Sequence, residues 1–156
     1  MREQNQNSGM TLVELLVVLS IIAIVTSMLI PKIERRDYYL LTSSRMLRDE
    51  IRTIRYMKMT EGKNYRILLG DNRYVIFENN KPVKDVKLEK NLKIAHNISG
   101  GNIYFSHIGA PLKSGTIRII DDETNNYCEI TIVPATGRVL LKNQIFEGYI
   151  GNKSNN

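Results

Sequence analysis

Residues 10–30 read MTLVELLVVLSIIAIVTSMLI, and this stretch decides the fold of the N-terminal part of the chain. It contains 21 residues and one charged side chain, Glu14. As an α-helix it would extend about 31 Å, close to the roughly 30 Å hydrocarbon core of a bilayer. A buried helix this long and apolar would be unusual in a small soluble domain. The stretch is therefore predicted to be a transmembrane helix.

A secretory signal would explain the same stretch less well. Such a signal has an apolar part of roughly 7–15 residues, followed by a cleavage site made of small residues. Here the apolar part is longer, and Pro31, Lys32 and Ile33 follow it. The sequence therefore favours a retained helix.

The carboxylate of Glu14 needs a physical reason, because a charged side chain at mid-bilayer costs about 2.5–3.5 kcal/mol. One interpretation places it close enough to the interface to reach water. The other gives it a partner. If the chain were cut between Gly9 and Met10, a new α-amino cation would lie four residues before Glu14. In an assembly, the amino group of one subunit could then neutralise Glu14 of the next and set the register of the two helices.

The string SGMTLVELLVVLSIIAIV, residues 8–25, resembles the processing site of type IV prepilins and pseudopilins. The resemblance implies that a prepilin peptidase cuts after Gly9 and methylates the new N-terminus at Met10. It also implies that Glu14 is the family's glutamate at the fifth mature position, which acts in assembly and register. Pro31 falls where these proteins often have a helix-kinking proline. Met10 departs from the phenylalanine that is commoner at the first mature position.

Two criteria give opposite orientations for the predicted membrane helix. Only Arg2 is basic before it, while Lys32, Arg35 and Arg36 follow it, so charge counting would place the C-terminal side in the cytoplasm. The resemblance implies the reverse, because the peptidase must reach Gly9 from the cytoplasm. We therefore predict a single-pass protein of the inner or cytoplasmic membrane, with a cytoplasmic N-terminus and an extracytoplasmic C-terminal domain, which enters a filament after assembly.

Residues 31–61 keep a helical pattern and form an amphipathic continuation of the helix. The apolar positions lie 7, 4 and 3 residues apart, which places them on one stripe of a helix. They are Leu40, Leu47, Ile51 and Ile54. We expect this stripe to pack on the sheet that follows.

A row of arginines lies on a neighbouring face of the same helix, again at spacings of 3 and 4. Its members are Arg45, Arg48, Arg52 and Arg55. A solvated surface is the favoured interpretation. Ion pairing between packed subunits and contact with a DNA backbone remain open.

From residue 62 to residue 147 the period changes to two, which predicts an antiparallel β domain. The expected strands are Tyr65–Leu69, Arg73–Glu78, Val83–Leu88, Leu92–Ile98, Asn102–His107, Thr116–Ile120, Tyr127–Val133 and Val139–Leu141. Turns are expected at 70–72, 79–82 and 121–126. A polar, flexible tail is predicted for 148–156, and the leader peptide for 1–9.

The late segments GTIRIID (115–121) and CEITIVPATGRVLL (128–141) also resemble the C-terminal region of the H-type (GspH/FimT-like) pseudopilins. That resemblance implies a pilin-like α+β fold, in which a long N-terminal helix packs on small antiparallel sheets.

No residue set predicts enzyme chemistry, a cofactor or a metal. The acids at 121–123 are adjacent rather than spaced like calcium ligands, so a solvated hairpin turn is favoured. His96 and His107 lack metal-ligand spacing and are interpreted as strand residues. Cys128 alternates with apolar neighbours and is predicted to be a buried small hydrophobe. Nucleophile-elbow, dinucleotide-binding and Walker motifs are absent from the sequence.

The sequence thus predicts a minor pilin or pseudopilin of a type II secretion or type IV pilus-like filament. The expected partners are other pilin-type subunits, the prepilin peptidase, an inner-membrane platform and a separate assembly ATPase. The net charge of +6 and the arginine row keep open a competence pseudopilin that contacts DNA. A membrane-anchored binding module that never assembles is the other alternative.

Overall fold

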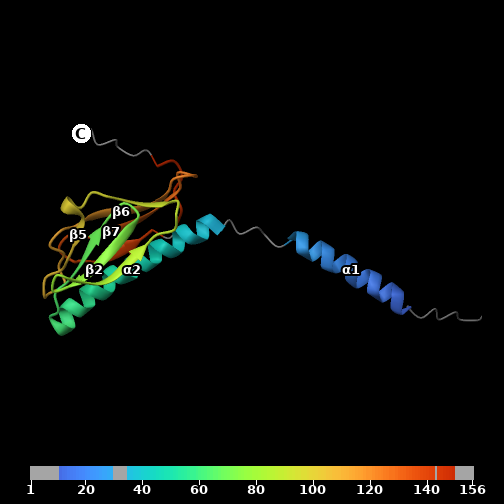
Figure 1. Cartoon of the computed structure of the whole chain (residues 1–156), viewed down its shortest axis with the longest axis horizontal. Helices are drawn as coiled ribbons and strands as arrows, with labels where there is room; N and C mark the ends of the chain where they lie inside the picture. Colours follow the sequence, from blue (N-terminus) through green and yellow to red (C-terminus); the bar gives the residue numbers. More distant parts are fainter. Residues whose placement is uncertain (1–10, 30–34, 143, 150–156) are drawn as a thin grey trace, which may run out of the picture. The chain divides into compact units, whose positions relative to one another are not determined.

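The computed structural model of the chain describes residues 11–29, 35–142 and 144–149 (Figure 1). The chain divides into two compact units, one ending at Ile33 and the other beginning at Glu34. The first unit contains helix α1, Leu12–Leu29. The second contains helix α2, Arg35–Glu61, followed by eight strands and one 3₁₀ turn, η1, Ser99–Gly101.

Helix α2 packs on the sheets through the predicted apolar stripe. Leu40, Leu47 and Ile51 are fully buried, and Ile54 is 2% exposed. The helix contacts β1, β6, β7 and β8, which belong to two different sheets. The prediction that this stripe packs on the sheet is therefore confirmed, and the core of the second unit lies between α2 and both sheets.

All strand pairs of the two sheets are antiparallel. One sheet has the order β3-β2-β1-β5 and contains β1 (Tyr65–Leu69), β2 (Arg73–Glu78), β3 (Lys81–Lys87) and β5 (Asn102–Ile103). The other has the order β4-β6-β7-β8 and contains β4 (Leu92–His96), β6 (Gly115–Asp121), β7 (Tyr127–Ile132) and β8 (Val139–Leu141). The predicted α+β class, a helix on two small antiparallel sheets, is confirmed.

The turn predicted at 79–82 is shorter than expected. It consists of Asn79 and Asn80, whose φ angles of 46° and 70° suit a two-residue hairpin turn. Pro82 lies inside β3, opposite Phe77, where the register of β2 and β3 shifts. A proline is tolerated there because β3 is an edge strand and the irregularity removes the need for its missing N–H.

The strand predicted over Asn102–His107 is the least accurate of the set. Only Asn102–Ile103 is a strand, and Phe105 makes a single bridge to Pro111. His107 lies in a turn and is exposed, so its assignment to a strand was wrong. The other strands agree with the predicted bounds to within two residues at each end.

The predicted flexible tail begins too early. The backbone N–H of Tyr149 donates to the Asn125 carbonyl at 3.0 Å, and its ring contacts that of Tyr127 with centroids 5.6 Å apart. Tyr149 is therefore part of the packed unit. The rest of the predicted tail lies outside the described residues.

Tyr74 is a buried phenol whose hydroxyl has no hydrogen-bond partner among the described residues. Burial, aided by the negative charge of Glu50, raises its pKa from 10 to about 12. We expect Tyr74→Phe to increase the free energy of unfolding at pH 7 by about 1 kcal/mol, because it removes a buried polar group that forms no bond. The difference in free energy of unfolding between the variant and wild type should grow as the pH rises from 10 to about 12. In that range the Tyr74 phenol ionises in the unfolded wild type but not in the folded one, which stabilises the unfolded state of the wild type alone.

Urea denaturation of both proteins over this pH range measures the effect. Tyr56→Phe is the matched control, because the Tyr56 ring is 65% exposed. A Tyr74→Phe variant that unfolds more easily than wild type at pH 7 would mean that the hydroxyl has a partner in solution.

Candidate assembly site

Glu14 lies in the first turn of α1, and Thr11 caps that turn. The Thr11 carbonyl accepts the first helical hydrogen bond from the N–H of Leu15 at 3.1 Å. Its side-chain Oγ1 accepts the backbone N–H of Glu14 at 3.2 Å. This is the N-cap arrangement. The carboxylate of Glu14 is exposed and lies at the helix end where the macrodipole favours a negative charge.

The N-cap was missed at the sequence level, although the spacing of Thr11 and Glu14 matches the T-x-x-E pattern of a capping box. Two hydroxyls of this helix donate hydrogen bonds back to its own backbone. Ser20 Oγ donates to the Leu16 carbonyl at 2.8 Å, and Thr26 Oγ1 donates to the Ile22 carbonyl at the same distance.

The apolar side chains of α1 are exposed on every side of the helix. The large apolar residues from Leu12 to Val25 range from 40% exposed at Val18 to 74% at Leu12. A helix that is apolar all round needs either lipid or other apolar helices around it.

Three predicted site residues, Gly9, Met10 and Pro31, lie outside the described residues. Residues 10 and 30, the first and last residues of the predicted membrane helix, also lie outside the described residues. Among the residues that the structure does describe, no helix has the length and apolarity needed to cross a membrane.

The arginine row of α2 makes bonds inside its own chain that the sequence did not predict. Arg48 forms a two-point ion pair with Asp49, at 2.8 and 3.0 Å, and this pair lowers the pKa of Asp49. Arg52 Nη2 donates to the Val139 carbonyl at 2.8 Å. Arg45 is exposed.

Arg55 joins two loops to α2. Its Nε donates to the Gly109 carbonyl and its Nη2 to the Thr136 carbonyl, each at 2.9 Å. Both acceptors are backbone carbonyl oxygens, which every residue has, so the sequence contains no signal for this role of Arg55. Contact of the row with DNA or with another subunit stays an open alternative to the favoured solvated surface.

The acidic residues at 121–123 do not converge on one point. Asp121 ends β6, is 3% exposed and accepts the backbone N–H of Glu123 at 2.9 Å, so its interpretation as part of a solvated turn was wrong. Asp122 pairs with Lys93, and Glu123 accepts from Asn91. Within the described residues, no group of three His, Cys, Asp or Glu side chains could hold a metal ion.

Cys128 and His96 lie where the sequence placed them. Cys128 is fully buried in β7, and burial raises the pKa of its thiol. His96 is the last residue of β4.

Comparison with known proteins gives two independent findings. The model of the prokaryotic N-terminal methylation motif matches residues 4–30. Two crystal forms of the type IV minor pilin FimU of Pseudomonas aeruginosa have similar folds. They show 16% and 14% identity and TM-scores of 0.57 and 0.53, and they cover 72% and 65% of this chain and 92% and 90% of theirs.

The minor pseudopilin EpsH from the type II secretion system of Vibrio cholerae is also similar. It shows 12% identity and a TM-score of 0.53 and covers 67% of this chain and 93% of its own. No curated protein sequence matches the chain. The chain thus combines the N-terminal methylation motif with a fold that it shares with minor pilins, which confirms the predicted resemblance to the type IV prepilins and pseudopilins.

Proposed function

We propose that this chain is a minor pilin or pseudopilin, a structural subunit that enters a type II secretion or type IV pilus-like filament through its N-terminal helix. The observation that carries the proposal is the position of Glu14, in the capped first turn of an apolar helix inside the methylation motif. The fold shared with FimU and EpsH supports it. The role is structural, and the protein itself hydrolyses nothing.

The helix would assemble by packing, with Glu14 supplying the register. Between apolar helices in lipid there is little hydrophobic driving force, so side-chain packing and polar pairing decide how they associate. Cleavage after Gly9 would give each subunit a cationic amino group at Met10. That group, on a neighbouring subunit, would neutralise the Glu14 carboxylate in a medium where an ion pair is strong.

This mechanism also defines location and partners. The precursor would lie in the inner or cytoplasmic membrane, anchored by the helix over 10–30, with the second unit outside the cytoplasm. The prepilin peptidase would process it, and an inner-membrane platform driven by a separate ATPase would add it to other pilin-type subunits.

Mass spectrometry of the protein from its native host tests the processing step. We expect an N-terminus at Met10 that carries one methyl group, because the peptidase would both cut and methylate there. A host that lacks the peptidase should yield the chain with its leader intact. Protein that still begins at Met1 in peptidase-competent cells would contradict the proposal.

A further inference from the structure

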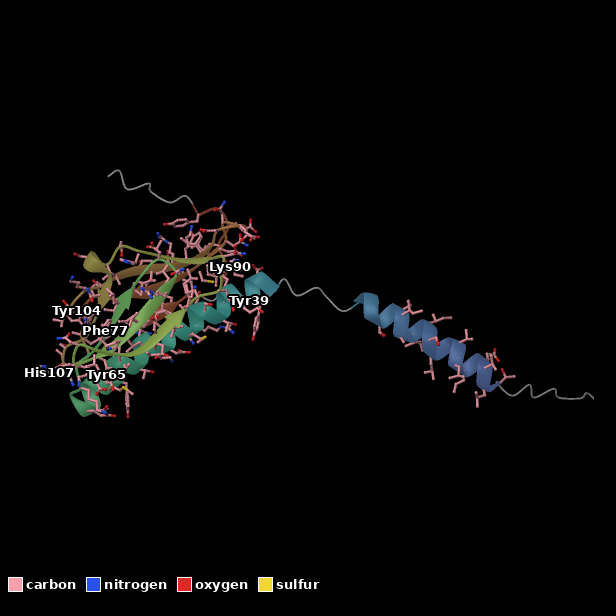
Figure 2. The ribbon with its side chains drawn as sticks, in the orientation of Figure 1. Tyr39, Tyr65, Phe77, Lys90, Tyr104 and His107 are labelled. Atoms are coloured by element: carbon pink, nitrogen blue, oxygen red, sulfur yellow. The ribbon has the colours of Figure 1, made fainter. Side chains whose placement is uncertain are left out.

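A cavity of about 660 Å³ opens at the end of the second unit where α2 stops. Its walls come from the last turn of α2, the start of β1, the β2–β3 turn and the segment 104–112. Figure 2 shows Tyr65, Tyr104 and His107 gathered at this end. Its volume is in the range of small-molecule sites, about 300–1,000 Å³.

Two cations line this cavity, and among the described residues both bind only neutral acceptors. Lys58 Nζ donates to the Asn64 Oδ1 at 2.5 Å and to the Gly62 carbonyl at 3.3 Å. Arg66 Nη1 donates to Asn102 Oδ1 at 3.0 Å, while its buried Nε has no hydrogen-bond partner in the described part of the chain.

Two other cations on the same sheet have carboxylate partners. Arg73 pairs with Asp85 at 3.6 Å, and Lys84 pairs with Glu50. The nearby Glu78 carboxylate interacts with the hydroxyl of Tyr65 and does not line the cavity. The cavity lining therefore contains Lys58 and Arg66 but no carboxylate, a composition that favours a negatively charged ligand.

The rest of the wall suits a sugar ring. Tyr65 and Tyr104 are half-buried, so part of each aromatic ring is available for the C–H face of a sugar ring. Amide and hydroxyl groups, which both donate and accept, complete the lining and match sugar hydroxyls. They belong to Asn64, Asn79, Asn80 and Ser106.

We propose that this cavity binds a single sugar residue that carries a carboxylate or a phosphate. Lys58 and Arg66 neutralise the acid group, the tyrosines pack on the ring, and the amides bond its hydroxyls. The subunit would thereby recognise an acidic glycan or sugar phosphate. All residues that line this site belong to the second unit, and the proposed assembly role rests on Glu14 in the first, so failure of the site would leave the assembly role untouched.

Calorimetric titration of the purified full chain in detergent micelles tests the site. The ligands are D-glucuronate, D-glucose 6-phosphate, D-glucose, inorganic phosphate and a single-stranded thymidine oligonucleotide. We expect saturable one-site binding of glucuronate or glucose 6-phosphate, with glucose and inorganic phosphate at least about tenfold weaker. The stronger of the two acidic sugars identifies the acid group.

Lys58→Gln and Arg66→Gln should each weaken that binding by about tenfold, because each removes a charge-assisted hydrogen bond. Arg73→Gln, a matched change on the neighbouring strand outside the cavity, should leave it unchanged. Arg66 also stacks on Phe77 at 4.2 Å, so thermal unfolding checks its fold, and Lys58→Gln carries the test if Arg66→Gln unfolds.

The proposal is overturned by three results. The first is the absence of saturable binding of either acidic sugar. The second is inorganic phosphate binding as well as glucose 6-phosphate does, with glucuronate no tighter than glucose. The third is an oligonucleotide that binds more tightly than the sugars and depends on Lys58, which would make the cavity a nucleic-acid site.

Discussion

Replacing Glu14 with leucine is expected to reduce incorporation of the chain into filaments by about a hundredfold or more. In the proposed assembly the carboxylate meets the amino group of a neighbouring subunit inside an apolar bundle. Removing one partner of a buried ion pair costs about 3–5 kcal/mol, because the other charge is left without compensation. The same substitution should leave the free subunit at least as well inserted in the membrane, since a lone carboxylate is costly there.

The measurement compares the amount of the chain in sheared filament fractions with the amount left in membranes. Glu14→Gln should lose incorporation as Glu14→Leu does, because it removes the charge and keeps the size. Ser20→Leu is the matched control, since it makes a polar-to-leucine change elsewhere in α1, at a hydroxyl that bonds only within the helix. Normal incorporation of Glu14→Leu would favour the non-assembling membrane anchor instead.

Replacing Gly137 with alanine is expected to lower the free energy of unfolding by about 3 kcal/mol or more. Gly137 has a φ of 64°, and a Cβ there would lie 2.1 Å from the Gly109 carbonyl oxygen. That oxygen also accepts the hydrogen bond from Arg55. The side chain would therefore separate two loops that α2 holds together, in addition to the cost of about 1–2 kcal/mol for a left-handed residue with a Cβ.

Gly62→Ala separates the two costs. Gly62 has nearly the same φ, 67°, but a Cβ there would meet nothing within 4 Å. This control should lose only about 1–2 kcal/mol in urea denaturation, the conformational part of the effect. Equal losses for the two variants would show that the loops are not in contact in solution.

Local patterns in the sequence predicted most of the fold. The apolar stripe of α2 and the hairpin between β1 and β2 follow from periodicity and turn residues, so neither depends on distant parts of the chain. Cys128 was placed correctly because strand alternation alone assigns it to the buried face. The α+β class then followed from one long helix and several short strands.

The errors and omissions arise where a residue's role depends on partners far along the chain. Arg52 and Arg55 bond backbone carbonyls at Val139, Gly109 and Thr136, which carry no signature in the sequence. Asp121 is buried by its place at the end of β6, although it has acidic neighbours.

The cavity beside Lys58 was not predicted for the same reason. Four separate segments build it, and one of them, 104–112, follows directly after β5, which ends at Ile103. The spacing of residues within one segment does not indicate that the four segments come together in the folded chain.

Because Cys128 is buried, the surface of the described part of the protein presents no thiol to reagents. The chain has one cysteine, that thiol is inaccessible, and burial keeps it protonated beyond its usual range by raising its pKa. Maleimides and other alkylating labels should therefore modify only cysteines introduced by mutation. Fluorophores, spin labels or crosslinkers can be attached to cysteines introduced at exposed positions without first replacing Cys128. Such labels would allow neighbouring subunits to be mapped in the proposed filament.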